Sequence, residues 1–160
     1  MTLEANKVLV RRYFEEAPDH REICDELLAD EFQVQPIHHA TVIDDGGSCP
    51  PAFKTFAAWL HSTGSGPSMN VDEIMAEGDR VAARWTFRGT HDRGAFLGAP
   101  PSGKEVAYTG ITIFRVARGK LAEGWALLDR LWLFQQLGVV PDTGELLANG
   151  AKPGAAEQDG

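Results

Sequence analysis

One acidic residue interrupts an apolar run near the C-terminal end of the sequence. Asp129 lies in the segment WALLDRLW at positions 125–132, which we expect to be the last strand of a sheet. Because side chains alternate between the two faces of a strand, Trp125, Leu127, Asp129 and Leu131 would share one face. If that face lines a closed pocket, the carboxylate loses solvation and becomes a better proton acceptor. The pattern therefore predicts Asp129 as a general acid/base residue.

The same carboxylate also fits a structural role, as one half of an ion pair. Three arginines could supply the other half: Arg84, Arg115 and Arg130. Both interpretations stay open, because structural ion pairs perturb carboxylates as active sites do.

His91 is a second candidate for proton transfer. It has the same parity as Trp85 and Phe87 in a strand expected over residues 80–91, so it would point into the same pocket. An imidazole exchanges protons readily near neutral pH. The alternative is a histidine at the edge of a loop, exposed to solvent. His38 and His39 have no Asp, Glu or Cys at metal-ligand spacing, and we predict no metal site.

Large aromatic residues are spread along the chain and could form walls around a flat, apolar ligand. We predict substrate-binding roles for Tyr13, Trp59, Trp85, Phe87, Tyr108, Phe114 and Trp125. The alternative for each is packing in the core. The glycine-rich segment at 92–104 matches neither phosphate-binding pattern, and no G-x-S-x-G elbow is present. We therefore expect neither a nucleotide cofactor nor covalent catalysis.

Helices that could support such a pocket are expected in the first part of the chain. Val10, Tyr13, Phe14 and Ala17 recur at the spacing of one helical face, and Thr2 is a suitable N-cap. We expect helices over residues 3–17, 19–28 and 53–60.

After Met69 the apolar residues recur at every second position, which is typical of strands. Besides a short extended piece at Phe32 and Val34, we expect two hairpins, over residues 71–91 and 105–132. Both strands of the second hairpin carry apolar residues on both faces, which predicts that both faces are covered. Helices followed by antiparallel strands indicate an α+β fold, with a curved antiparallel sheet wrapped around the helices and enclosing a pocket. We expect one domain over residues 1–140 and a flexible tail over 141–160.

Composition narrows the function classes. The chain has 160 residues and a formal net charge of −8 with scattered basic residues, which argues against nucleic acid and anionic membrane surfaces as partners. No apolar run approaches the roughly 18 residues of a spanning helix, and no secretory signal is evident. Cys24 and Cys49 show no metal or redox spacing, so a cytoplasmic location is expected.

Several phrases together resemble the SnoaL-like polyketide cyclase family, over about residues 6–138. They lie at 6–14, 77–85, 89–91, 96–103 and 110–115, and in Trp125-x-x-x-Asp129 followed by Leu133–Gly138. Gln35 stands where the family frequently has histidine, and we predict that it contacts substrate. Residues 37–49 show no family pattern.

The resemblance implies the cone-shaped fold of nuclear transport factor 2, a homodimer, and a small apolar or aromatic substrate. It also implies ring closure by aldol chemistry without a cofactor, with Asp129 as acid/base and the setting of secondary metabolism, such as antibiotic biosynthesis. Two alternatives remain on the same fold. One is epoxide opening, with His91 or Arg84 assisting the carboxylate, and the other is ligand binding without catalysis.

Overall fold

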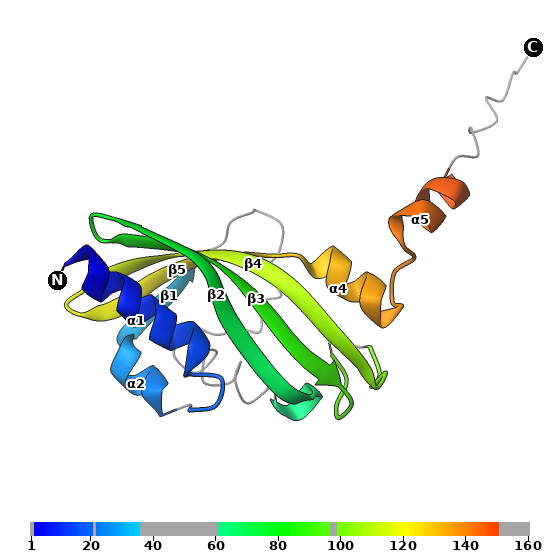
Figure 1. The fold of residues 1–160 in the computed structure, drawn as a ribbon, viewed down its shortest axis with the longest axis horizontal. Coiled ribbons are helices and arrows are strands. Elements are labelled where there is room, and N and C mark those ends of the chain that lie inside the picture. The colour runs from blue at the N-terminus through cyan, green and yellow to red at the C-terminus, as the bar shows by residue number, and fades with distance from the viewer. Residues whose placement is uncertain (1, 21, 36–60, 97–98, 151–160) are drawn as a thin grey trace, which may run out of the picture.

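A sheet of five strands forms the body of the protein, in the order β1-β5-β4-β3-β2. The structure, a computed structural model, describes residues 2–20, 22–35, 61–96 and 99–150. The strands are β1 (Leu28–Gln35), β2 (Ser65–Glu77), β3 (Arg80–His91), β4 (Lys104–Ala117) and β5 (Lys120–Leu128). The α+β class is confirmed, and Figure 1 shows the curvature of the long strands β2, β3 and β4. The helix predicted over 53–60 lies outside the described residues.

The sheet is mixed rather than wholly antiparallel, which corrects the prediction. β2, β3, β4 and β5 pair antiparallel in sequence order, whereas β1 pairs parallel with β5. Local turn signals predict hairpins, but nothing local to β1 shows which distant strand it will join or in which direction.

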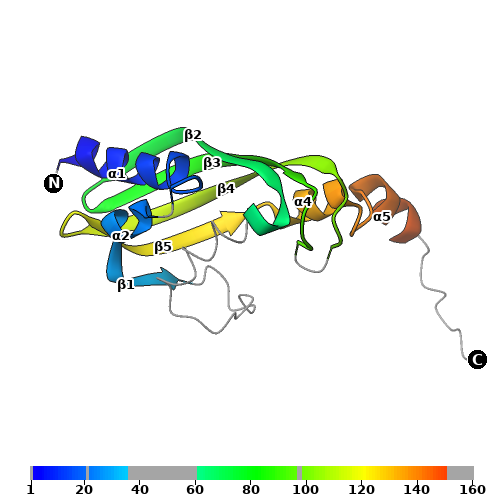
Figure 2. The same ribbon diagram turned by 90° about the horizontal axis from the view of Figure 1, so that it is seen from below.

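Helix α1 (Leu3–Glu15) lies across β2 and β3 on one face of the sheet (Figures 1 and 2). Its N-cap is Thr2, as predicted, whose hydroxyl accepts a hydrogen bond from the Ala5 amide at 3.2 Å. The second helix is shorter than predicted, because α2 spans only Ile23–Leu27 and Leu28 already begins β1. No side-chain hydrogen bond from a described residue caps the start of α2.

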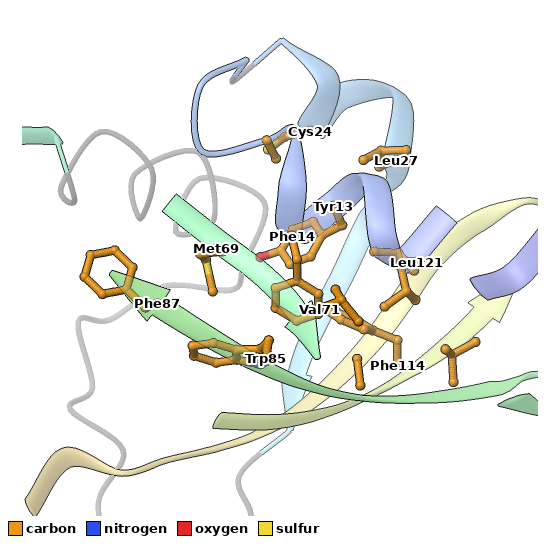
Figure 3. Packing of buried hydrophobic residues seen from close by; sticks show 14 of the residues in the cluster. Tyr13, Phe14, Cys24, Leu27, Met69, Val71, Trp85, Phe87, Phe114 and Leu121 are labelled. Atoms are coloured by element: carbon orange, nitrogen blue, oxygen red, sulfur yellow. The ribbon is translucent and has the colours of Figure 1, made fainter. Parts of the chain in front are cut away.

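Aromatic rings fill the space between α1 and the sheet (Figure 3). Phe114 is fully buried, and the rings of Tyr13 and Phe14 lie 5.2 and 5.8 Å from it. Phe14 also packs on Trp85, with ring centroids 5.5 Å apart. This cluster fixes the inner faces of β3 and β4, which carry the candidate site at one end.

In the residues that the structure describes, the outer face of the sheet is partly exposed, so the expected covering of both faces is not met within the single chain. Along β4, Tyr108, Thr112 and Phe114 are buried, whereas Ile111 and Ile113 are 50% and 39% exposed. Leu127, opposite Ile111 on β5, is 51% exposed. Apolar residues on both faces of a strand therefore do not show that this chain alone covers both.

Two helices follow the sheet. Strand β5 ends at Leu128, helix α4 spans Arg130–Leu137, and helix α5 spans Thr143–Gly150, within the segment expected to be a loose tail. Both figures show α5 standing away from the body of the sheet. None of the described helices is long and apolar enough to cross a membrane.

Candidate active site

A small hollow, with a cavity volume of about 20 Å³, opens at one end of the sheet, where β2 begins, β3 ends and β4 begins. Phe87, Phe96, Val106 and Pro67 give it apolar walls. Its polar lining residues are Thr63, Ser65, Thr90, His91 and Tyr108. Apolar walls with a few polar groups are typical of a small-molecule site.

His91 lies in this hollow and points inward, as its parity with Trp85 and Phe87 predicts. It is the last residue of β3 and is only 4% exposed. Nε2 lies 2.9 Å from the Gly94 carbonyl oxygen, so Nε2 carries a proton and donates it. Nδ1 lies 3.3 Å from Ser102 Oγ, and in the neutral ring it accepts the hydroxyl proton.

These contacts make His91 the anchor of the loop between β3 and β4. Its backbone carbonyl also accepts hydrogen bonds from the amides of Ser102 and Gly103, at 3.0 and 2.7 Å. The ring of Phe96, from the same loop, meets the imidazole edge-on at 6.2 Å. One residue thus holds both arms of the loop that forms a wall of the hollow.

Tyr108 enters the hollow from β4 and is 3% exposed. Its ring packs between two others, with centroids 4.9 Å from Phe87 and 6.0 Å from Trp85. Burial raises the pKa of its hydroxyl well above the usual value, and the positive charge of Arg130 opposes that rise. Tyr108 therefore keeps its proton and acts as a donor.

Trp85 packs against the ring of Tyr108 and is itself held in place. Its indole nitrogen donates a hydrogen bond to Thr112 Oγ1 at 2.9 Å, in the buried interior. Gly110 makes room for the indole, because a Cβ there would lie 2.4 Å from Trp85 Cζ2. The ring behind Tyr108 is thus held by a hydrogen bond on one side and by backbone on the other.

Asp129 lies outside the last strand, which corrects its predicted position. It is the N-cap of α4, with its Oδ1 accepting a hydrogen bond from the Trp132 amide at 3.0 Å. The side chain is exposed and is not among the residues lining the hollow. None of the three arginines proposed as ion-pair partners binds it in the described part of the chain.

Asp129 is nevertheless close to the strand that carries Tyr108. Its amide donates to the carbonyl oxygen of Thr109, the residue after Tyr108, at 3.0 Å. Oδ1 is used by the cap, whereas Oδ2 accepts no hydrogen bond from a described residue. One carboxylate oxygen is therefore available to a ligand.

The other predicted binding residues are distributed over three environments. Phe87 lines the hollow, whereas Tyr13, Trp85 and Phe114 lie in the aromatic core (Figure 3). Trp125 is on the outer face, because it pairs with exposed Ile113 and stacks under the guanidinium of Arg80 at 4.8 Å.

Two further predicted residues, Trp59 and Gln35, lie wholly or partly outside the described structure. Trp59 lies outside the described residues. The backbone of Gln35 ends β1 beside Trp125, and its side chain lies outside the described part of the structure.

Sequence reasoning missed Phe96, Ser102 and Val106. A glycine-rich loop directly after an inward-pointing histidine was the available signal for Phe96 and Ser102. Within the described ranges, no group of three or more His, Cys, Asp or Glu side chains is arranged to hold a metal ion.

Known structures share this architecture. AclR, a candidate hydroxylase from Streptomyces galilaeus, matches with a TM-score of 0.74 at 21% identity, over 93% of this chain and 90% of its own. TsrD from Streptomyces laurentii matches with a TM-score of 0.72 at 26% identity, over 88% and 99%. A candidate SnoaL-like polyketide cyclase from Jannaschia sp. CCS1 matches with a TM-score of 0.70 at 25% identity, over 86% and 94%.

No curated protein matches the sequence. The family model for SnoaL-like polyketide cyclases matches residues 8–137, which include every strand of the sheet, the described lining of the hollow and Asp129. The chain therefore belongs to the SnoaL-like polyketide cyclase family.

Proposed function

We propose that this protein is an enzyme that closes a ring in a small polyketide-like substrate, by general acid/base catalysis and without a cofactor. The observation that carries the proposal is the hollow, whose apolar walls surround Tyr108 on β4, next to Thr109, whose carbonyl oxygen binds the Asp129 amide. Family membership supports the reaction class.

Asp129 is the proposed proton carrier. Its carboxylate takes a proton from a carbon next to a carbonyl, the C–H electron pair moves toward the carbonyl oxygen, and an enolate forms. The enolate carbon then attacks a second carbonyl carbon of the same molecule, which makes the new C–C bond. The resulting alkoxide takes the proton back from Asp129, so the product is an isomer of the substrate and needs no oxidant or reductant.

The Asp129 side chain is exposed to solvent in the free protein. A substrate bound over the mouth of the hollow would exclude water from the carboxylate and strengthen it as a base. Capping helps in another way, since the hydrogen bond from Trp132 fixes the carboxylate and leaves Oδ2 to face the ligand.

His91 has a positioning role in this proposal. Both ring nitrogens are engaged, so the neutral imidazole has no free lone pair to offer a substrate. By holding the loop, His91 keeps Phe96 in the wall of the hollow.

The test is Asp129→Asn, because asparagine caps a helix about as well as aspartate but cannot carry the proton. A panel of aromatic methyl esters that carry a β-keto group and a further ketone able to accept the enolate carbon would be incubated without added metal or cofactor, and products of unchanged mass would be followed by liquid chromatography and mass spectrometry. We expect kcat to fall by about 100-fold or more, with an unchanged unfolding midpoint.

Asp142→Asn is the matched control. Asp142 Oδ1 caps the start of α5 by accepting from the Glu145 amide at 2.9 Å, so the chemical change and the structural role are the same. We expect this control to keep full activity. Near-normal turnover by Asp129→Asn would reduce Asp129 to a helix cap and refute its assignment as proton carrier.

A further inference from the structure

The Tyr108 hydroxyl has no hydrogen-bond partner among the residues that the structure describes. Tyr108 lines the hollow and is only 3% exposed. The hydroxyl is not a fully buried unpaired group, so it keeps accessible surface, and a donor without a partner beside an apolar hollow can be paired by a ligand that supplies the acceptor.

We propose that the Tyr108 hydroxyl binds the substrate carbonyl oxygen and stabilises it as it becomes an enolate oxygen. The inference rests on the proposed function, and it assigns the ligand class of the hollow: planar carbonyl compounds that can become oxyanions. Tyr108 is then a catalytic residue in addition to Asp129.

Two other polar residues of the hollow, Ser65 and His91, already have hydrogen-bond partners. Ser65 Oγ donates to Asp92 Oδ2 at 2.6 Å. His91 donates from Nε2 to the Gly94 carbonyl, and its Nδ1 faces Ser102 Oγ. Of these three lining residues, only Tyr108 has a donor without a hydrogen-bond partner in the described part of the chain.

Charge favours an oxyanion at this position. Burial raises the pKa of Tyr108, so the hydroxyl stays protonated and can donate. Arg130, on the first turn of α4, acts electrostatically on the Tyr108 oxygen in the opposite sense to burial. A positive charge that favours negative charge on the tyrosine oxygen also favours it on a ligand oxygen bound there.

The ring is also held in place before any ligand arrives. Phe87 and Trp85 contact its two sides, and the Trp85 indole is fixed by Thr112. A donor fixed in advance does not have to reorganise as charge develops, which is why such donors contribute strongly to catalysis.

The test uses para-nitrophenol, whose phenolate mimics a planar enolate, and para-nitroanisole, which has the same ring but cannot form an anion. Affinities for wild type, Tyr108→Phe and Thr109→Val would be measured across a pH series. Thr109→Val is the matched control, because it removes a hydroxyl from the neighbouring residue on the exposed face of the same strand.

We expect Tyr108→Phe to bind the phenolate about tenfold or more weakly, with unchanged affinity for para-nitroanisole. Thr109→Val should match wild type for both compounds. Turnover of the β-keto esters by Tyr108→Phe should fall by about 100- to 1,000-fold, as for the loss of one oxyanion donor. Equal phenolate affinity of Tyr108→Phe and wild type would overturn the inference.

A second measurement needs no variant. An apolar hollow without a donor would raise the pKa of bound para-nitrophenol, whereas a donor and a positive charge would lower it, which the phenolate absorbance reports directly. A raised pKa in the wild-type complex, or the absence of binding, would also overturn the inference. If phenolate binding follows the prediction but no β-keto ester is cyclised, the proposed function fails while the oxyanion site stands.

Discussion

The side-chain amide of Gln136 makes both hydrogen bonds that a neighbouring strand would make to Ala107. Its Oε1 accepts from the Ala107 amide at 3.0 Å, and its Nε2 donates to the Ala107 carbonyl at 2.7 Å. β5 has ended before this point, so a helix side chain replaces it at the edge of β4. The motif at residues 133–138, which resembles the family pattern, therefore attaches α4 to β4 beside the hollow.

Gln136→Ala should loosen α4 from β4. Two backbone groups lose their partner, and we expect the free energy of unfolding to fall by about 1 to 2 kcal/mol. Urea denaturation would measure the fall, and hydrogen exchange at the Ala107 amide would localise it. Gln135→Ala is the control, because among described residues its side chain bonds only the exposed Pro141 and Thr143. Equal effects of the two changes would contradict the special role of Gln136.

Gly110→Ala should disturb the support of Tyr108. The added methyl group would meet the Trp85 ring at 2.4 Å, and overpacking of this kind costs about 1 to 3 kcal/mol. We expect a lower unfolding midpoint and weaker binding of para-nitrophenolate. Gly144→Ala on α5, where the nearest atom is the Asp142 carboxylate oxygen at 3.1 Å, should be neutral or slightly stabilising. A Gly110→Ala protein with wild-type stability and binding would refute this account of the glycine.

His91 and Ser102 should be energetically coupled. The double-mutant cycle with His91→Phe and Ser102→Ala would isolate their contact at 3.3 Å, with an expected interaction energy of about 0.5 to 1.5 kcal/mol. Each single variant should also make the loop at residues 92–96 more susceptible to limited proteolysis. Strict additivity of the two changes would show that the loop is held by other contacts.

We expect the homodimer to form through the exposed outer face of the sheet. Ile113→Asp places a charge in the middle of the exposed apolar residues Ile111, Ile113 and Leu127. Sedimentation equilibrium should show a dimeric wild type and a monomeric variant. Val8→Asp makes the same change at a 57% exposed position on α1 and should leave the dimer intact. A wild type that is monomeric at all concentrations would contradict the prediction.

Stability should decline in acid partly through Glu123. The hydrogen bond from Arg115 lowers the pKa of the Glu123 carboxyl, and burial opposes the shift. A pKa lowered by folding stabilises the protein above the pKa of the unfolded chain, and this contribution is lost as pH falls through the folded value. Glu123→Gln should therefore flatten the acid limb of the plot of urea midpoint against pH. Glu31→Gln, at an exposed position, should retain the wild-type slope, and identical slopes for all three proteins would refute the assignment.

The inward position of His91 could be predicted because period two runs unbroken from Val81 to the end of β3. The alternation of side chains also placed Trp125 and Leu127 correctly on one face of the sheet. It could not show which face α1 covers, and both residues lie on the opposite, outer face. The predicted position of Asp129 was wrong because this residue lies between the end of β5 and the start of α4. Whether residue 129 extends a strand or caps a helix depends on the hydrogen bond to Trp132, which alternation of side chains does not reveal.

The register between β3 and β4 determines the relative positions of Tyr108 and His91. Phe87 lies opposite Tyr108 and His91 lies opposite Lys104, so the hairpin alignment sets their separation along the sheet. The sequence could not show which of the seven aromatic residues bind substrate, because pocket walls and protein cores are both built from aromatic side chains. Only the positions at the end of the sheet, beyond the reach of α1, line the hollow.

The parallel contact between β1 and β5 has a consequence for biogenesis. As the ribosome releases the chain, Leu28–Gln35 emerges early, and its partner Lys120–Leu128 emerges only after every other strand. Pairings between such distant segments form slowly, and the waiting strand presents unpaired backbone groups in the meantime. The interval before β5 is synthesised is therefore when nascent chains are most prone to join one another edge to edge, and when a chaperone would do most to preserve yield.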